Sequence, residues 1–143
     1  MKKVIIAMSG GLDSSVAAAL VKERGMEAIG VFMRLYPGSL RGSEKRARKV
    51  AKILGIPFYV LNFEKEFKRK VIDYFLEEYK KGRTPNPCIV CNKEIKFGLL
   101  LKHALALRAD FVATGHYARK QRTTNNEQRT KYKLLRGKDK GKD

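Results

Sequence analysis

The sequence predicts an α/β fold, with an open, mostly parallel sheet that has helices on both faces. Three observations support this prediction. Short apolar runs alternate with amphipathic helical patterns from residue 4 to residue 114. The stretches between these runs leave room for right-handed crossover helices, which parallel strands require. The first run leads through a glycine turn into a helical pattern, and such sheets bind ligands beyond the carboxyl ends of their strands.

Each element is expected where a local pattern predicts it. A strand is predicted where apolar residues run together, and a helix where they recur every three or four positions. In chain order, the expected elements are a strand over 4–8, a helix over 16–24, a strand over 28–34, a basic helix over 44–54, a strand over 58–63, a long helix over 64–81, a helix over 93–108 capped by Asn92, and a strand over 111–114.

Glycine and proline set the ends of these elements. Pro37 and Gly42 predict a loop over 35–43, while Gly55 and Gly82 are expected to end the helices before them. The apolar side of the long helix is expected to comprise Phe67, Val71, Tyr74 or Phe75, and Tyr79.

The segment 118–143 changes character, because it holds ten Lys or Arg residues and only a short apolar stretch around 132–135. It predicts a basic β-hairpin with Asn125 and Asn126 at its centre, followed by a solvated, mobile tail over 137–143. We therefore divide the chain into a body, residues 1–117, and a basic hairpin with its tail, residues 118–143.

The charge of the chain predicts a polyanionic partner. Among its 143 residues, 32 Lys and Arg against 14 Asp and Glu give a net charge of +18, which favours a nucleic acid over a merely solvated surface. No apolar run approaches the roughly 20 residues of a membrane span, and no signal peptide pattern opens the chain, so we expect a cytoplasmic protein with no membrane partner. With two cysteines in a reducing compartment, a structural disulfide is not favoured.

The turn after the first strand has the chemistry of a phosphate site. Gly10 and Gly11 let the backbone turn sharply and approach a ligand, and the following helix presents unpaired N–H groups and the positive end of its dipole. Ser9 and Ser14 add hydroxyls, and Asp13 could hold Mg²⁺ bridged to phosphate oxygens. The Gly-Lys-Ser/Thr ending of a Walker A loop is absent. A serine-capped helix after a glycine turn is the purely structural alternative.

The pattern Ser-Gly-Gly-x-Asp-Ser over 9–14 resembles the PP-loop of the ATP pyrophosphatases. The resemblance implies an adenine nucleotide alpha hydrolase-like, Rossmann-like fold in which this loop binds the pyrophosphate half of ATP. It also implies chemistry at the α-phosphate, where an acceptor oxygen is adenylated, pyrophosphate leaves, and a nucleophile later displaces AMP.

Both cysteines lie in the stretch 83–92, which has the sequence Arg-Thr-Pro-Asn-Pro-Cys-Ile-Val-Cys-Asn. The prolines predict a stiff loop. Cys91 is expected just before a helix N-terminus, with Arg83 and Lys93 near it in sequence, and such surroundings lower the pKa of a thiol and favour a nucleophile. A metal or iron–sulfur site at Cys88 and Cys91, a redox pair, and two small core residues stay open as alternatives.

Three motifs together resemble the tRNA-specific 2-thiouridylases, which replace the C2 oxygen of the wobble uridine with sulfur in the tRNAs for Lys, Glu and Gln. They are Arg-Thr-Pro-Asn-Pro over 83–87, Cys-Asn-Lys-Glu-Ile-Lys-Phe over 91–97 and Ala-Thr-Gly-His-Tyr-Ala-Arg over 113–119. Arg136-Gly137 and Lys142-Asp143 also resemble this family, so the resemblance spans the whole chain.

The resemblance implies a role for each matching residue. Cys91 matches the first catalytic cysteine, which works with a second, persulfide-carrying cysteine and ends in a disulfide. The implied ATP-binding residues are Ala7, Met8, Ser9, Gly10, Gly11, Leu12, Asp13, Ser14, Met33 and Gly115. The implied tRNA-binding residues are Asn86, Pro87 and Cys88 at the target base, with His116, Lys142 and Asp143 elsewhere. The implied cofactors are ATP and Mg²⁺, and the implied partners are tRNA and a sulfur donor, either a cysteine desulfurase or a sulfur-relay protein.

Two departures from the family pattern bear on these roles. Cys88 stands where many members carry Asp, so an acid or base role at that position does not transfer. The family continues beyond residue 143 through the second catalytic cysteine and further tRNA-binding domains. We therefore expect a catalytic-domain fragment, or one part of a split enzyme with a missing chain or domains, that binds ATP but does not complete thiolation. The alternatives are a PP-loop enzyme that adenylates a small metabolite, a non-catalytic tRNA- and ATP-binding module, and a metal-bearing module.

Overall fold

A four-stranded parallel sheet forms the centre of the computed structural model, which describes residues 1–37, 41–124, 130–139 and 141. Its strands are β1 (Lys3–Ala7), β2 (Glu27–Arg34), β3 (Phe58–Asn62) and β4 (Phe111–Ala113), in the order β3-β2-β1-β4. Ile5 of β1 pairs with Ile29 of β2 on one side and with Val112 of β4 on the other. The expected parallel α/β sheet is confirmed, with strand ends within one residue of the prediction.

Helices connect these strands. They are α1 (Leu12–Glu23), α2 (Arg41–Leu54), α3 (Glu64–Phe67), α4 (Asp73–Lys80), α5 (Pro87–Cys91) and α6 (Leu100–Ala106). Two π-helical segments, η1 (Lys68–Ile72) and η2 (Asn92–Leu99), join α3 to α4 and α5 to α6 without a break. The long helix expected over 64–81 is therefore present with a π segment in its middle, and Gly82, at φ 71°, follows its end.

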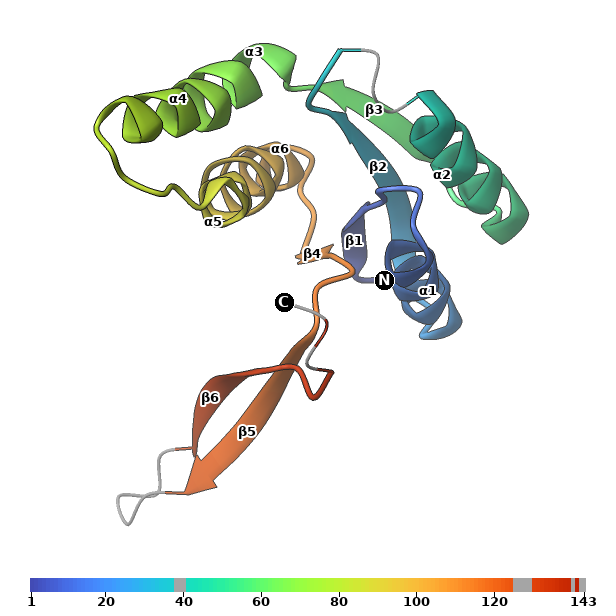
Figure 1. Ribbon diagram of the computed structural model, residues 1–143. Helices are drawn as coiled ribbons and strands as arrows, with labels where there is room; N and C mark the ends of the chain where they lie inside the picture. The colour runs from blue at the N-terminus through green and yellow to red at the C-terminus, as the bar shows by residue number, and fades with distance from the viewer. Residues whose placement is uncertain (38–40, 125–129, 140, 142–143) are drawn as a thin grey trace.

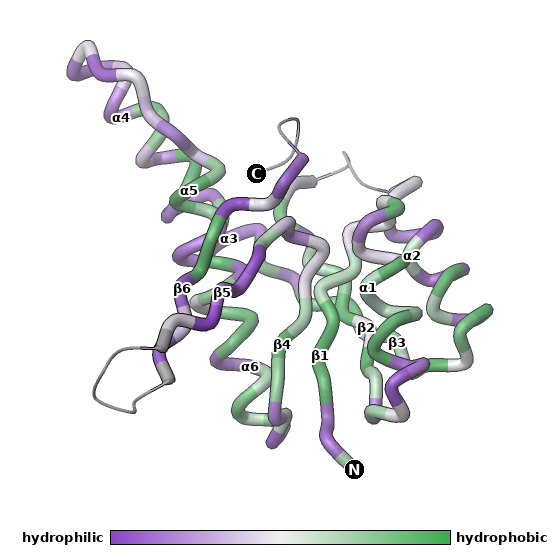
Figure 2. Tube along the Cα trace, turned by 90° about the horizontal axis from the view of Figure 1, so that it is seen from below, coloured by the Kyte–Doolittle hydropathy of each residue, from purple (hydrophilic) through white to green (hydrophobic). Residues whose placement is uncertain are grey.

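The helices cover both faces of the sheet, because successive side chains of a strand point to opposite faces. Val4, Ile6 and Met8 pack against α1 and α2, whereas Ile5 and Ala7 pack against α6. Figure 2 shows the apolar strands between these two layers. A third apolar cluster comprises Phe63, Val71, Cys91 and Ile95, and it joins the α3-η1-α4 helix to the α5-η2-α6 helix.

Several predicted boundaries are wrong. The first helix begins at Leu12 instead of residue 16, and α2 begins at Arg41, so the last three residues of the loop expected over 35–43 are helical. Residues 38–40 of that loop lie outside the described part of the chain. Tyr79 is not on the buried side of its helix, since 55% of it is exposed.

The loop expected around the cysteines is confirmed over residues 83–86 but is wrong over Pro87–Cys91, because this part, with both cysteines, is helical. Asn86 is the N-cap of α5, and its Oδ1 accepts a hydrogen bond from the Ile89 amide at 3.2 Å. Pro87 occupies the first turn, where its missing N–H costs nothing. Asn92, expected as the cap, instead lies inside the continuous helix.

The basic segment forms the expected hairpin, with β5 (Ala118–Thr124) antiparallel to β6 (Thr130–Arg136). Figure 1 shows this two-stranded sheet projecting from the body. The expected centre at Asn125 and Asn126 lies outside the described residues. Within the described part of the chain, no helix is long and apolar enough to cross a membrane.

Candidate nucleotide site

A cavity of about 340 Å³ opens at the carboxyl edge of the sheet, where the ends of β1, β2 and β4 converge. The position agrees with the rule for ligand sites in open parallel sheets. The residues that line the cavity are Ala7, Met8, Ser9, Gly11, Asp13, Ser14, Phe32, Met33, Leu35, Lys96, Thr114, Gly115, His116 and Tyr117.

One wall of the cavity is the loop between β1 and α1. Gly10 has φ 79°, a conformation that favours glycine, and a Cβ at this position would lie 2.2 Å from the carbonyl oxygen of Ser43. Arg46 of α2 supports the loop, because its Nε donates to the Gly10 carbonyl at 3.1 Å and its Nη2 donates to Ser43 Oγ at 2.8 Å. The loop is therefore held from outside by the start of α2.

Hydroxyl groups stiffen the same loop from inside. Ser14 Oγ accepts a hydrogen bond from the Ser9 amide at 3.2 Å and donates to the Gly11 carbonyl at 3.1 Å, to which Ser15 Oγ also donates at 2.8 Å. Gly11 is the N-cap of α1 and supplies no capping side chain, so the serines close the turn without capping the helix. The N-terminus of this helix, with its positive dipole end, faces the loop in a geometry suited to phosphate.

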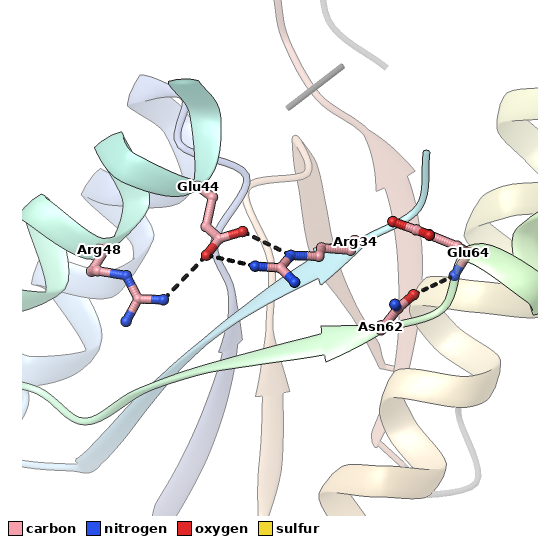
Figure 3. A network of polar contacts seen from close by, with 5 residues as sticks. All are labelled: Arg34, Glu44, Arg48, Asn62 and Glu64. Atoms are coloured by element: carbon pink, nitrogen blue, oxygen red, sulfur yellow. Dashed lines mark hydrogen bonds and ion pairs between the residues drawn. The ribbon is translucent and has the colours of Figure 1, made fainter. Parts of the chain in front are cut away.

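Arg34, at the end of β2, fixes α2 beside this loop. Its guanidinium pairs with Glu44 at 2.9 and 3.2 Å, and Arg48 Nη2 pairs with Glu44 Oε1 at 3.2 Å (Figure 3). The hydrogen bond from Arg34 is the largest cause that lowers the pKa of Glu44, so this carboxylate stays charged at neutral pH. At the end of the neighbouring strand, Asn62 Oδ1 accepts a hydrogen bond from the Glu64 amide.

The segment after β4 closes the cavity against the loop. Gly115 passes so near the start of α1 that a Cβ would lie 2.9 Å from the Ser14 amide nitrogen and 3.2 Å from Asp13 Cβ. Tyr117 donates a hydrogen bond to Asp13 Oδ1 at 2.9 Å. Asp13 is the single acidic side chain among the described lining residues, and one carboxylate is enough for a Mg²⁺ that is otherwise bound by phosphate oxygens and water.

His116 and Lys96 of the η2 segment form a further part of the cavity wall. His116 Nδ1 lies 2.8 Å from Thr114 Oγ1, and its Nε2 lies 3.2 Å from Asn92 Oδ1. Burial is the main cause that lowers the pKa of His116, with the positive charge of Lys96 as a second cause. The imidazole is therefore neutral at neutral pH and contacts the residue next to Cys91.

Cys91 does not have the environment that the sequence predicted. It lies inside a helix and is 9% exposed, and burial raises the pKa of its thiol above the ordinary value, although the charge of Lys96 acts in the opposite direction. The expectation of a lowered pKa is wrong, because Cys91 packs against Phe63, Val71 and Ile95 instead of facing a free helix N-terminus. Both cysteines are free thiols, and Cys88 is exposed.

The cavity brings together most of the predicted ATP-binding residues. Eight of them line it, namely Ala7, Met8, Ser9, Gly11, Asp13, Ser14, Met33 and Gly115. His116, which was expected to contact tRNA, also lines the cavity. Gly10 shapes the loop without lining the cavity, while 79% of Leu12 is exposed. Asn86, Pro87, Cys88 and Cys91 do not line it, and Lys142 and Asp143 lie outside the described residues.

The cavity is also lined by four residues that were not predicted from the sequence, namely Phe32, Leu35, Lys96 and Tyr117. Lys96 and Tyr117 belong to the two motifs around Cys91 and His116, which could have suggested them. The metal alternative finds no support, because among the described residues no three His, Cys, Asp or Glu side chains lie close enough to hold a metal ion.

Comparison with known proteins agrees with this geometry. A family model described as the tRNA methyl transferase HUP domain matches residues 2–143. The tRNA-specific 2-thiouridylase MnmA of Carboxydothermus hydrogenoformans is 53% identical over 154 residues, which cover 99% of this chain and 41% of the relative. The protein of the same name from Clostridium acetobutylicum is 57% identical over 129 residues, which cover 82% of this chain and 36% of the relative. The chain thus spans about two fifths of the length of these curated relatives.

Solved structures show the same fold at lower identity. A predicted subunit of tRNA methyltransferase from Methanocaldococcus jannaschii has a TM-score of 0.57 and 25% identity, over 90% of this chain and 60% of that one. The NH3-dependent NAD synthetase from Campylobacter jejuni has a TM-score of 0.53 and 18% identity, over 76% of this chain and 45% of that one. The likeness to the synthetase concerns the fold alone.

Proposed function

The chain belongs to the family described as the tRNA methyl transferase HUP domain, and from this premise we propose that it is the ATP-binding part of an enzyme that thiolates the wobble uridine of tRNA at C2. The observation that carries the proposal is the glycine loop after β1, which faces the strand ends across a cavity of about 340 Å³. Relatives that are about half identical to this chain are named tRNA-specific 2-thiouridylases. These names support a tRNA acceptor over the small metabolite of the alternative hypothesis.

ATP would occupy the cavity with its phosphates on the glycine loop. Leu12 to Ser14 present the first backbone amides of α1, the part of a helix that attracts anions, and Ser9 adds a hydroxyl beside them. Phe32 and Met33, at the end of β2, offer apolar surface for the adenine or ribose. Asp13 would hold Mg²⁺, which neutralises the polyphosphate when bound.

The proposed chemistry has two stages. The uridine O2 attacks the α-phosphate and pyrophosphate leaves, so that the oxygen becomes part of a good leaving group. The terminal sulfur of a persulfide on the second cysteine then attacks C2 and AMP leaves, which joins the uridine to that cysteine through an S–S bond. Cys91 attacks the sulfur of the second cysteine, so that this S–S bond breaks, the 2-thiouridine leaves with the transferred sulfur, and a disulfide between the two cysteines remains. No residue of this chain is assigned as the persulfide cysteine, and the sulfur donor is a cysteine desulfurase or a sulfur-relay protein.

The tRNA would be held mainly through its phosphates. The described strands of the hairpin carry six Lys or Arg residues and no acid, in keeping with the net charge of +18. The contacts proposed for the target base are Asn86, Pro87 and Cys88, at the exposed start of α5. His116, Lys142 and Asp143 are further proposed contacts. An unpaired anticodon base can leave its stack and reach such a site.

The test is the release of AMP and pyrophosphate from Mg-ATP, with and without unmodified tRNA for Lys or Glu, in the wild type and in Cys91→Ser. Release that needs tRNA and persists in Cys91→Ser supports uridine adenylation before the cysteine acts. Release that is independent of tRNA supports a small-molecule acceptor instead. ATP binding without release would indicate that parts beyond this chain position the tRNA.

A further inference from the structure

Lys96 is a half-buried cation that lines the cavity and has no ion-pair partner among the described residues. Its surroundings differ from those of other lysines near it. Glu94, two residues before Lys96 in η2, is the nearest acidic residue in sequence. Its carboxylate pairs with Lys70 at 2.7 Å and not with Lys96. A lysine that lines a cavity and has no carboxylate paired with it is available to an anion that binds there. The position is therefore explained best by an anion that enters the cavity.

The cavity has few other cations for a polyphosphate. Lys96 is the one lysine or arginine among the described lining residues, and the glycine loop lacks the lysine that a Walker A loop would supply. Arg46 lies close to the loop, but its guanidinium is occupied by the Gly10 carbonyl and Ser43 Oγ. Lys96 is therefore the described lining side chain that brings a positive charge of the protein itself to the nucleotide.

The place of Lys96 also connects the cavity to Cys91. Its charge acts on both the His116 imidazole, which lines the cavity, and the buried Cys91 thiol. Lys96 follows Cys91 by five residues in a π-helical segment, whose i to i+5 hydrogen bonds bring such residues to the same side of the helix. The ammonium therefore lies where a nucleotide phosphate and the sulfur chemistry would meet.

We propose that Lys96 binds the α-phosphate of ATP, the phosphate that remains in AMP, while the glycine loop binds the pyrophosphate half. This inference rests on the proposed function. The two walls then divide the polyphosphate between them, with the bond that breaks lying at their boundary. After pyrophosphate leaves, Lys96 keeps its contact with the adenylate and stabilises the charge on AMP as AMP is displaced.

The test compares the affinities of the 143-residue chain for AMP, inorganic pyrophosphate and adenosine by calorimetry. In Lys96→Ala, AMP affinity is expected to fall roughly tenfold to a hundredfold, the range for one lost charge-assisted hydrogen bond. Pyrophosphate and adenosine affinities are expected to stay within about twofold. Lys96→Arg is expected to keep most of the AMP affinity. Lys93→Ala, which removes an exposed cation of the same segment, is the matched control and should change none of the three.

Each outcome decides the inference. Unchanged AMP affinity in Lys96→Ala would overturn it, and so would an equal loss for pyrophosphate, which would place Lys96 at the other end of the polyphosphate. An equal loss in Lys93→Ala would show that only the net charge matters, and would also overturn it. If the wild type binds neither AMP nor pyrophosphate, the nucleotide site itself is refuted, and that result is distinct from a failure of Lys96 alone.

Discussion

The Tyr117 hydroxyl donates a hydrogen bond to Asp13 Oδ1 at 2.9 Å, and so joins two segments that are 104 residues apart in the chain. Asp13 lies in the first turn of α1, directly after the glycine loop, and Tyr117 follows β4. The bond closes the cavity on the side where Gly115 runs against the start of α1. The acceptor is the carboxylate that we propose as the Mg²⁺ ligand.

Substitutions at the two ends of this bond should have different effects. Tyr117→Phe removes a solvent-exposed hydrogen bond, so the free energy of unfolding should fall by about 1 kcal/mol or less, with Mg-ATP affinity nearly unchanged. Asp13→Asn keeps an acceptor for Tyr117 but removes the charge, so Mg-ATP affinity should fall at least about tenfold at similar stability. Chemical denaturation and calorimetry measure the two quantities. Equal Mg-ATP affinities in wild type and Asp13→Asn would refute the metal-binding role.

Gly10→Ala should disrupt the phosphate loop. The added Cβ would lie 2.2 Å from the Ser43 carbonyl oxygen, and the residue would keep a positive φ. Gly25→Ala is a matched control, because Gly25 has φ 70° and open space around the position of a Cβ. Gly25→Ala should lower the free energy of unfolding by about 1 kcal/mol, the effect of a positive φ on alanine. Gly10→Ala should lower it by about a further 1–3 kcal/mol and should abolish ATP binding. Similar denaturation midpoints for the two variants would show that the contact with Ser43 is not tight.

The Cys91 thiol should react slowly with iodoacetamide near neutral pH, because burial raises its pKa and limits access. Cys88 is exposed and serves as the internal reference for the alkylation rate, which peptide mass spectrometry resolves. Lys96→Ala should slow Cys91 further, since the charge of Lys96 lowers this pKa. Faster alkylation of Cys91 than of Cys88 would contradict the buried position.

The same raised pKa gives a direction for stability against pH. In the folded state Cys91 keeps its proton at a pH where the unfolded chain has lost it, so the unfolded state binds fewer protons there. The contribution of Cys91 to stability is full below the ordinary pKa of a thiol and falls as the pH rises above it. Cys91→Ser should flatten this alkaline decline in the free energy of unfolding.

The sheet was predictable because each of its strands is a short apolar run with a helical pattern beside it. The start of α5 was not predicted, because the prolines favoured a loop. Pro87 instead lies in the first turn of a helix, and Asn86 caps that helix. The glycine loop and Gly115 were placed correctly at one cavity. Lys96 was missed, since the direction of its side chain depends on the π-helical segment, which no local pattern in the sequence predicts.

The hairpin should contribute to tRNA affinity through phosphate contacts. Lys133 is exposed and lies opposite Gln121 in the ladder, with no acidic residue among the described strand positions. Lys133→Ala should weaken binding for all tRNA sequences alike and reduce the slope of log affinity against log salt by about 1. Lys52→Ala, in the last turn of α2, is the control with the same change in net charge. If both variants have the same slope, long-range charge explains the binding and the hairpin makes no specific contact.

The most direct test of the nucleotide site is amide NMR of the ¹⁵N-labelled chain during titration with Mg-ATP. The cavity geometry predicts saturable shifts of the amides of Ser9 to Ser14 and of Gly115, with pyrophosphate shifting the loop alone. Shifts confined to the basic hairpin, of equal size for any polyanion, would contradict the site, because they would show that ATP binds only through the net positive charge.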